Sequence, residues 1–201
     1  MKKIIEQKLS PILTFLKPWL IAGVVLVLFK STGILAGMSD MTHRALLSTG
    51  FLDAEVIASP TTDFNYEFEI RDLQGKNINV SSYKGKVIFF NMWATWCGPC
   101  RAEMSSIQQL YSKINNKNIS FIMLSIDQRG QEQKVQNYVK SQQFTFPIFM
   151  PVNSVPEQLQ VPSIPTTFII GKDGKVVSKQ VGSTNFDTPE FKKFLEGLAS
   201  K

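Results

Sequence analysis

Two cysteines, Cys97 and Cys100, carry the clearest chemistry in this 201-residue sequence, and the chain has no others. They stand at the point where an apolar run ends and a helical pattern begins. Cys97 is therefore expected at a helix N-terminus, where unpaired N–H groups and the helix dipole favour an anion and lower a thiol pKa. Two intervening residues bring Cys100 within disulfide distance, and Pro99 suits the first helical turn. The pattern predicts a dithiol that attacks a partner disulfide with Cys97 and resolves the mixed disulfide with Cys100.

The elements that must position these sulfurs follow an alternating pattern of strands and helices, which predicts an α/β layer. Residues 86–93 are almost continuously apolar, as expected for a central strand buried on both faces. Residues 64–80 predict a hairpin, and Asp187 with Glu190 is expected to cap the last helix. Further strands are expected at 119–126, 146–150, 166–170 and 175–181, helices at 97–114, 132–142 and 187–199, and a proline-rich loop with a turn of helix at 151–162.

The N-terminal segment predicts export. Trp19–Phe29 is a run of eleven apolar residues, and four lysines precede it. A bilayer span needs about 20 residues, so the run would have to extend within residues 12–37 past a lysine that snorkels to the headgroups. We expect an uncleaved anchor. A cleaved signal peptide is the competing interpretation, because eleven residues also suit a signal sequence, and a buried soluble helix is the third.

This interpretation divides the chain into three parts. Residues 1–37 would be a cytoplasmic stub and a transmembrane signal-anchor, residues 38–61 a juxtamembrane connector, and residues 62–201 a folded domain. The lysines before the apolar run keep the N-terminus in the cytoplasm, so the folded domain is expected outside it, on the periplasmic or extracytoplasmic face.

Composition excludes several other classes. The net charge is +6, but residues 1–30 hold five basic residues and one acid, so they supply +4 of it. The other 17 basic and 15 acidic residues leave a net charge of only +2. This part of the sequence has no stripe of Lys and Arg interleaved with aromatic residues, so we expect no nucleic-acid partner. Two cysteines and the single histidine, His43, rule out a histidine-rich metal site and a four-thiolate zinc site. We expect no cofactor, no resident metal and a monomer.

The residues around the cysteines resemble a known family. Trp96-Cys97-Gly98-Pro99-Cys100 after a buried strand, with Ile164-Pro165-Thr166 before a later one, is similar to thioredoxin. The fuller resemblance, over about residues 62–200, is to the exported, membrane-anchored TlpA/ResA-type thiol–disulfide oxidoreductases. It rests also on the run 85–96, on Arg101-Ala102-Glu103-Met104 and on the anchor. The resemblance implies a thioredoxin-like fold with an extra N-terminal hairpin at 64–80 and an inserted segment between the motif and Pro165.

The resemblance also assigns roles to individual residues. Cys97 would be the nucleophile and Cys100 the resolving thiol. Pro165 would be a cis-proline facing the disulfide, with its flanking backbone pairing with the substrate chain. Trp96 either shapes the docking surface or is simple apolar cover. The residues expected to contact substrate are Trp96, Gly98, Pro99, Ile164 and Pro165.

Glu103 has two interpretations. Its spacing alone, three residues after Cys100, favours a first-turn carboxylate that complements the helix dipole. The resemblance implies instead that Glu103 transfers protons and tunes the cysteines. Thioredoxin has a buried Asp six residues before its first cysteine, but that position is Asn91 here, which cannot titrate. Glu103 is therefore the better candidate for proton transfer with Cys100.

The leading functional prediction is an exported dithiol–disulfide oxidoreductase working as a reductase, because Gly98-Pro99 is the dipeptide of thioredoxin, which is strongly reducing. By resemblance, its substrates are disulfides in exported proteins, with apocytochrome c as the leading candidate, and a membrane thiol–disulfide transporter is its electron donor. An oxidase or isomerase with the same site stays open. Two further classes compete with it: a thiol peroxidase, which would need a threonine where Ala94 stands, and a Cu(I) chaperone, which would need a histidine in the domain.

Overall fold

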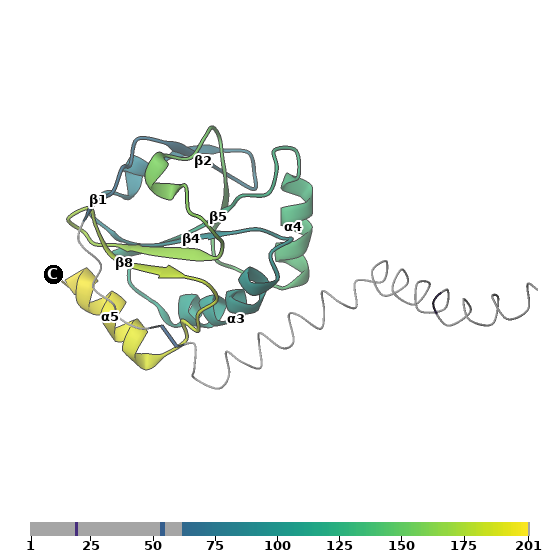
Figure 1. Ribbon diagram of the computed structural model, residues 1–201. Helices are drawn as coiled ribbons and strands as arrows, with labels where there is room; N and C mark the ends of the chain where they lie inside the picture. Colours follow the sequence, from purple (N-terminus) through teal and green to yellow (C-terminus); the bar gives the residue numbers. More distant parts are fainter. Residues whose placement is uncertain (1–18, 20–52, 55–61, 201) are drawn as a thin grey trace, which may run out of the picture. The chain divides into compact units, whose positions relative to one another are not determined.

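One mixed sheet organises the part of the chain that the structure describes (Figure 1). The computed structural model describes Trp19, Asp53, Ala54 and residues 62–200. Its strands lie in the order β1-β8-β7-β4-β5-β6-β2-β3. The strands are β1 (Thr62–Asp63), β2 (Glu69–Asp72), β3 (Asn77–Asn79), β4 (Val87–Trp93), β5 (Ile119–Ser125), β6 (Ile148–Pro151), β7 (Thr166–Ile170) and β8 (Lys175–Val181).

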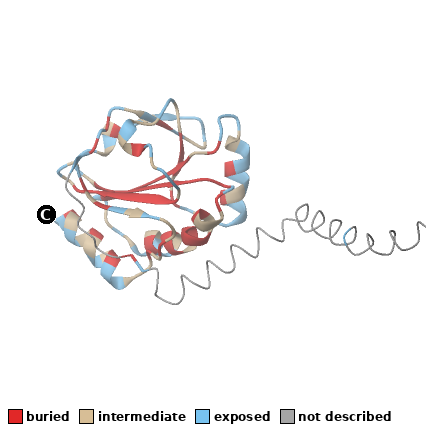
Figure 2. Ribbon diagram, in the orientation of Figure 1, coloured by how far each residue is buried: buried red, intermediate tan, exposed pale blue. Residues whose placement is uncertain are grey.

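The central strand is β4, as its apolar run predicts. All seven of its residues are buried (Figure 2), and it pairs in parallel with β5 and antiparallel with β7. Successive side chains of a strand point to opposite faces, so β4 supplies both halves of the core. Phe89 lies in one hydrophobic cluster and Phe90 in the other. The predicted α/β architecture, a thioredoxin-like mixed sheet with helices, is confirmed.

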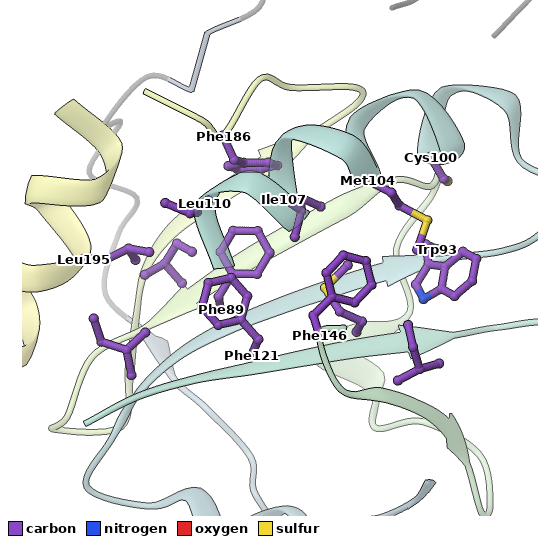
Figure 3. Packing of buried hydrophobic residues seen from close by; sticks show 14 of the residues in the cluster. Phe89, Trp93, Cys100, Met104, Ile107, Leu110, Phe121, Phe146, Phe186 and Leu195 are labelled. Atoms are coloured by element: carbon purple, nitrogen blue, oxygen red, sulfur yellow. The ribbon is translucent and has the colours of Figure 1, made fainter. Parts of the chain in front are cut away.

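Helices contribute to the cluster around Phe89 (Figure 3). They are α3 (Gly98–Lys113), α4 (Glu132–Ser141) and α5 (Pro189–Ser200). Residues of α3 such as Met104, Ile107 and Leu110 are wholly buried against it, and Phe89 stacks on Phe121 of β5 at a ring-centroid distance of 4.9 Å. This packing fixes α3, the helix that begins beside the cysteines, on the sheet.

The opposite face is covered by the chain before β4 and by the segment 152–164 after β6, which includes the 3-10 helix η2 (Glu157–Leu159). The hairpin predicted at 64–80 is confirmed as β2 and β3, but it is shorter than expected. Phe64 and Tyr66 precede the strand and pack in the cluster around Phe90. The chain turns there, since Phe68 N–H donates to the Tyr66 carbonyl at 2.9 Å.

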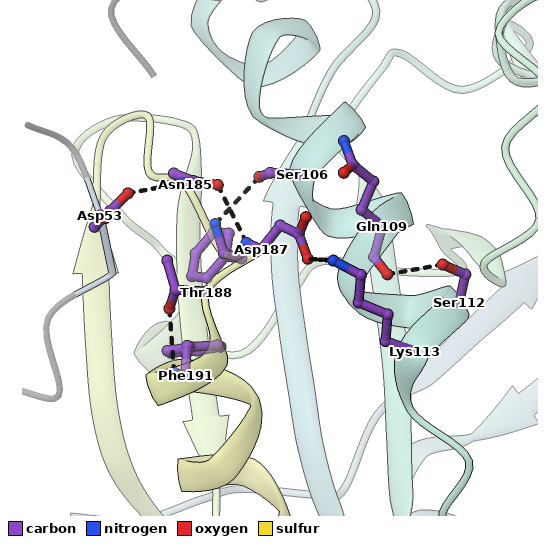
Figure 4. A network of polar contacts seen from close by, with 10 residues as sticks. Asp53, Ser106, Gln109, Ser112, Lys113, Asn185, Asp187, Thr188 and Phe191 are labelled. Atoms are coloured by element: carbon purple, nitrogen blue, oxygen red, sulfur yellow. Dashed lines mark hydrogen bonds and ion pairs between the residues drawn. The ribbon is translucent and has the colours of Figure 1, made fainter. Parts of the chain in front are cut away.

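The cap predicted for the last helix is wrong by one residue. The Phe191 N–H donates to Thr188 Oγ1 at 3.2 Å, so Thr188 caps α5 (Figure 4). Asp187 instead makes an ion pair with Lys113 at the end of α3. Because the Asp187 carboxylate has the charged partner Lys113, the Thr188 hydroxyl is the group that accepts the N–H at the start of α5.

The predicted anchor at 1–37, apart from Trp19, and most of the predicted connector at 38–61 lie outside the described residues. No helix in the described part is long and apolar enough to span a membrane. Within the connector, Asp53 and Ala54 pair with Asn185: Ala54 N–H donates to the Asn185 carbonyl at 3.0 Å, and Asn185 Nδ2 donates to Asp53 Oδ1 at 2.6 Å. Ala54 is buried in the cluster around Phe89.

Candidate active site

The cysteine pair lies where β4 passes into α3. A turn closes after the strand, with Cys97 N–H donating to the Ala94 carbonyl at 3.1 Å, and α3 begins at Gly98 with Pro99 in its first turn. Cys97 is the N-cap: its sulfur accepts from the Cys100 N–H at 3.2 Å. The two cysteines form a disulfide, with their Cα atoms 5.3 Å apart. When the pair is reduced, the same N–H group would stabilise a Cys97 thiolate.

The two sulfurs differ in their access to solvent. Cys100 is wholly buried, whereas 5% of Cys97 is exposed and the adjacent Trp96 is exposed by 61%. Cys97 is therefore the sulfur that a partner protein can reach first, as the nucleophile assignment requires. Gly98 and Pro99 are half-buried beside it, at the surface where a partner would dock.

The loop before β7 faces the disulfide. The Ile164–Pro165 peptide bond is cis, as expected, and the Ile164 carbonyl oxygen lies 3.7 Å from the Cys97 sulfur. Antiparallel pairing of β7 with β4, which sets Thr166 opposite Met92, brings these distant segments together. The structure thus places Ile164 and Pro165 at the same site as the cysteines.

Glu103 is buried, with 1% exposed, and it does not lie in the first turn of α3, so the interpretation as a first-turn carboxylate that complements the helix dipole is wrong. Asn91 Nδ2 donates to its Oε1 at 2.8 Å, and the Thr184 N–H donates to its Oε2 at 3.1 Å. Burial raises the pKa of Glu103 to about 8, although both hydrogen bonds act to lower it. Most molecules therefore hold a neutral, protonated Glu103 at pH 7.

Asn91 and Glu103 form one buried unit behind the cysteines. The amide nitrogen of Asn91 also donates to Thr167 Oγ1 at 2.8 Å, so it links β4 with α3 and β7. The position of thioredoxin's buried acid thus holds a hydrogen-bond donor to Glu103. In this chain the titratable group of the unit is Glu103 on α3, and Asn91 on β4 is its hydrogen-bond donor.

Asp127, which follows β5, is a site residue that the sequence analysis missed. Thr95, in the turn before Cys97, donates to it twice: the N–H to Oδ2 at 2.8 Å and the hydroxyl to Oδ1 at 2.5 Å. Ser125 Oγ donates at 2.8 Å, and Lys134 Nζ lies 3.5 Å away. Burial alone would raise the pKa of Asp127, but these hydrogen bonds and the lysine charge lower it. The sequence signal that could have identified Asp127 was an acidic residue just after β5, the strand that pairs in parallel with β4.

No three His, Cys, Asp or Glu side chains converge as metal ligands anywhere in the described ranges. The arrangement brings together two sulfurs, an accessible one at a helix N-terminus and a buried one, with a neutral carboxyl group on the same helix.

Comparison with known proteins agrees with this geometry. Residues 60–179, more than half of the chain, match the model of the AhpC/TSA family. The chain belongs to this family. Within the family it is similar to a thiol-disulfide oxidoreductase ResA of Bacillus cereus, with 38% identity over 135 residues that cover 67% of this chain and 73% of that protein. ResA of Bacillus subtilis is 30% identical over 157 residues, covering 78% and 86%.

Solved structures lead to the same result. A thiol:disulfide interchange protein of the thioredoxin family from Chlorobium tepidum TLS superposes with a TM-score of 0.53 at 26% identity, covering 73% of this chain and 99% of that one. StoA from Bacillus subtilis, at 19% identity, shares the fold, with a TM-score of 0.53 and coverage of 70% and 98%. This member of the AhpC/TSA family is a thioredoxin-like thiol–disulfide oxidoreductase.

Proposed function

We propose that this oxidoreductase is a membrane-tethered reductase of disulfides in exported proteins. The observation that carries the proposal is the Cys97–Cys100 pair at the start of α3, with only Cys97 reaching the surface. The Gly98-Pro99 dipeptide between the cysteines supports the reducing direction. The lysines and the apolar run of residues 1–37 support a bilayer anchor within about residues 12–37, with the catalytic domain on the extracytoplasmic face.

Catalysis takes two exchanges. The Cys97 thiolate attacks one sulfur of the substrate disulfide, forming a mixed disulfide and releasing the other substrate sulfur as a thiolate. The Cys100 thiolate then attacks the Cys97 sulfur, which releases the second substrate sulfur and closes the Cys97–Cys100 disulfide. Two electrons and two protons pass to the substrate. A membrane thiol–disulfide transporter would return the electrons by the reverse exchange.

Glu103 serves the protons of these steps. It lies three residues after Cys100 on one face of α3, and its pKa of about 8 is near that of an ordinary thiol, about 8.5. A carboxyl group whose pKa lies this close to neutral pH can both give and take a proton as the sulfurs change between thiol and thiolate. Water would be a poor substitute for Glu103 in this proton transfer, because the side chain is almost wholly buried.

The substrates in this proposal are exported proteins with accessible disulfides, and the haem-attachment cysteines of apocytochrome c lead among them. The relatives named ResA support the oxidoreductase chemistry of this assignment. We also propose that the protein acts as a monomer.

The reduction potential of the full chain tests the direction of electron flow. The reduced and oxidised forms are equilibrated against glutathione and dithiothreitol buffers. A potential at or below about −230 mV supports the reductase, whereas about −120 to −180 mV would indicate an oxidase or isomerase and overturn the proposal.

Two further assays distinguish the reductase from a peroxidase and from a copper chaperone. Rapid peroxide consumption would favour the peroxidase, against which Ala94 argues, because it stands where a peroxidase needs a threonine; the hydroxyl of the neighbouring Thr95 donates to Asp127 instead. Tight Cu(I) binding, together with no turnover of protein disulfides, would favour the chaperone. Alkaline extraction of membranes and protease accessibility in intact cells test the anchor and its orientation.

A further inference from the structure

The segment 182–187, which follows β8, contacts two parts of the active site through hydrogen bonds. The Gly182 N–H donates to the carbonyl oxygen of the cis-proline, Pro165, at 2.9 Å. Ser183 Oγ donates at 3.2 Å to the carbonyl oxygen of Pro99, which stands between the two cysteines. The segment thus ties the loop of the cis-proline to the start of α3.

The same segment supplies a hydrogen-bond donor to the buried carboxyl group. The Thr184 N–H donates to Glu103 Oε2 at 3.1 Å, and Thr184 is itself buried. Two positions later Phe186 is wholly buried, and its N–H donates to Ser106 Oγ at 3.2 Å. The backbone between Thr184 and Phe186 therefore determines where the donor to Glu103 points.

Two residues from far earlier in the chain, Asp53 and Ala54, dock on this backbone at Asn185. Asn185 Nδ2 donates to Asp53 Oδ1 at 2.6 Å, and Asn185 Oδ1 accepts from the Asp187 N–H at 3.2 Å (Figure 4). The Ala54 N–H donates to the Asn185 carbonyl at 3.0 Å, and Ala54 is buried in the cluster around Phe89. Asn185 is thus held by its side chain and by its backbone, one position from the donor to the carboxyl group.

We propose that Asp53 and Asn185 are positioning residues for proton transfer by Glu103: they fasten the chain before β1 to the segment 182–187 and so keep the Thr184 N–H on the carboxyl group. The proposal rests on the role of Glu103 in the reductase function above. A hydrogen bond weakens steeply when its donor turns away from the acceptor. Release of Asn185 frees the backbone beside Thr184, so the ionised form of Glu103 loses part of its stabilisation while the side chain stays buried.

The surroundings of Glu103 set the direction of the expected change. Its hydrogen-bond partners, the Asn91 side chain and the Thr184 N–H, do not titrate, and the cysteines of α3 are joined in the oxidised protein. Among the described residues, the raised pKa of Glu103 comes from burial, and none of the charged groups on the elements that hold it contributes to the shift: Arg101, Lys113 and Asp187. Because the Thr184 bond lowers this pKa, weakening the bond raises it above about 8.

Carbon-13 NMR of the oxidised full chain follows the ionisation of Glu103 directly, with its carboxyl carbon assigned by comparison with Glu103→Gln. In Asp53→Ala the midpoint should rise by about 1 pH unit, the size expected when a hydrogen bond to a charged group is largely lost. The loss of the Asp53 charge would by itself act in the opposite direction. An unchanged or lower midpoint in Asp53→Ala would therefore overturn the proposal.

Two controls separate the hydrogen bond from the charge. Asp53→Asn removes the charge but keeps an oxygen that accepts from Asn185, so it should retain the wild-type midpoint. Asp63→Ala removes an exposed aspartate of β1 outside these contacts and should retain it as well. A midpoint in Asp53→Asn raised as far as in Asp53→Ala would contradict the role of the acceptor.

An exchange of the two side chains tests the pair from the other end. In Asn185→Asp the carboxylate at position 185 cannot donate to Asp53, so the midpoint of Glu103 should rise. The double variant Asp53→Asn/Asn185→Asp restores one amide donor and one carboxylate acceptor with their positions exchanged, and its midpoint should return to the wild-type value. Both variants carry the same carboxylate at 185, so a rise that persisted in the double variant would be an effect of that charge and would overturn the proposal.

The rate of insulin disulfide reduction, measured against pH with the reduced protein, connects the pair to the reaction. The pH profile of Asp53→Ala should shift upward together with the Glu103 titration, and the profile of Asp53→Asn should not. A shifted titration with an unchanged pH profile would overturn the role of the pair in proton transfer. A reduced wild-type protein that reduced no protein disulfide would refute the reductase function itself, whereas the NMR titration of the oxidised protein would still decide whether the pair positions the donor to Glu103.

Discussion

The ionisation of Glu103 gives the sharpest quantitative prediction. We consider Glu103→Gln in the oxidised protein, where the cysteines are joined and do not titrate. In the folded wild type the pKa of Glu103 is about 8, against an ordinary value of 4.5. Between these two pH values the folded protein holds a proton that the unfolded chain has released, so folding stability falls as the pH rises.

The size of the effect follows from the two pKa values. They differ by about 3.5, and each pKa unit corresponds to about 1.4 kcal/mol. The free energy of unfolding should therefore fall by about 5 kcal/mol between about pH 4.5 and pH 8 on account of Glu103 alone, and the contribution should level off above pH 8. This is a large part of the 5–15 kcal/mol that is typical of a whole domain.

Urea unfolding of the oxidised protein at pH 5, 6, 7, 8 and 9 measures this dependence. Glu103→Gln has no ionisable group at the position, so its stability should vary far less across the window, whatever its absolute value. Glu69→Gln, at an exposed position of β2, removes a carboxylate without touching the site and should retain the wild-type slope. If the wild type and Glu103→Gln had parallel pH profiles, the buried, neutral Glu103 would be refuted.

Three further predictions concern the same site. Cys100→Ser should trap a mixed disulfide between Cys97 and its substrate, seen as a dithiothreitol-sensitive adduct by mass spectrometry; turnover by this variant would contradict the resolving role. Asp127→Ala leaves the buried N–H and hydroxyl donors of Thr95, in the turn before the motif, without their acceptor. The variant should lose about 1–3 kcal/mol of unfolding free energy in urea, and alkylation of its Cys97 should be slower. Unchanged stability would show that Asp127 does not hold this turn. Asn91→Ala removes a hydrogen bond that lowers the pKa of Glu103, so the pH-dependent loss of stability should extend to higher pH; an unchanged midpoint would show that this bond does not matter.

Some features of the fold could be predicted because they depend on short stretches of sequence. The apolar run of β4, the helix that follows Cys97 and the strands at 166–170 and 175–181 are local patterns, and each element formed where expected. The strand expected to begin at Phe64 did not, because aromatic residues at alternate positions there pack on Phe90 from a turning chain. Alternation reports which side chains face the core, and it does not by itself require ladder pairing.

The sequence by itself determined the chemistry of this protein: two cysteines at a strand–helix junction are enough to predict a disulfide, since a spacing of three residues within one chain decides it. Only the tertiary structure decided the surroundings. Asn91 meets Glu103 because α3 packs on β4, Thr184 reaches the same carboxyl group across 81 residues, and Ile164 reaches Cys97 across 67. Burial sets the proton affinity of Glu103, and burial is a property of the packed sheet and helices, which no local pattern of residues specifies.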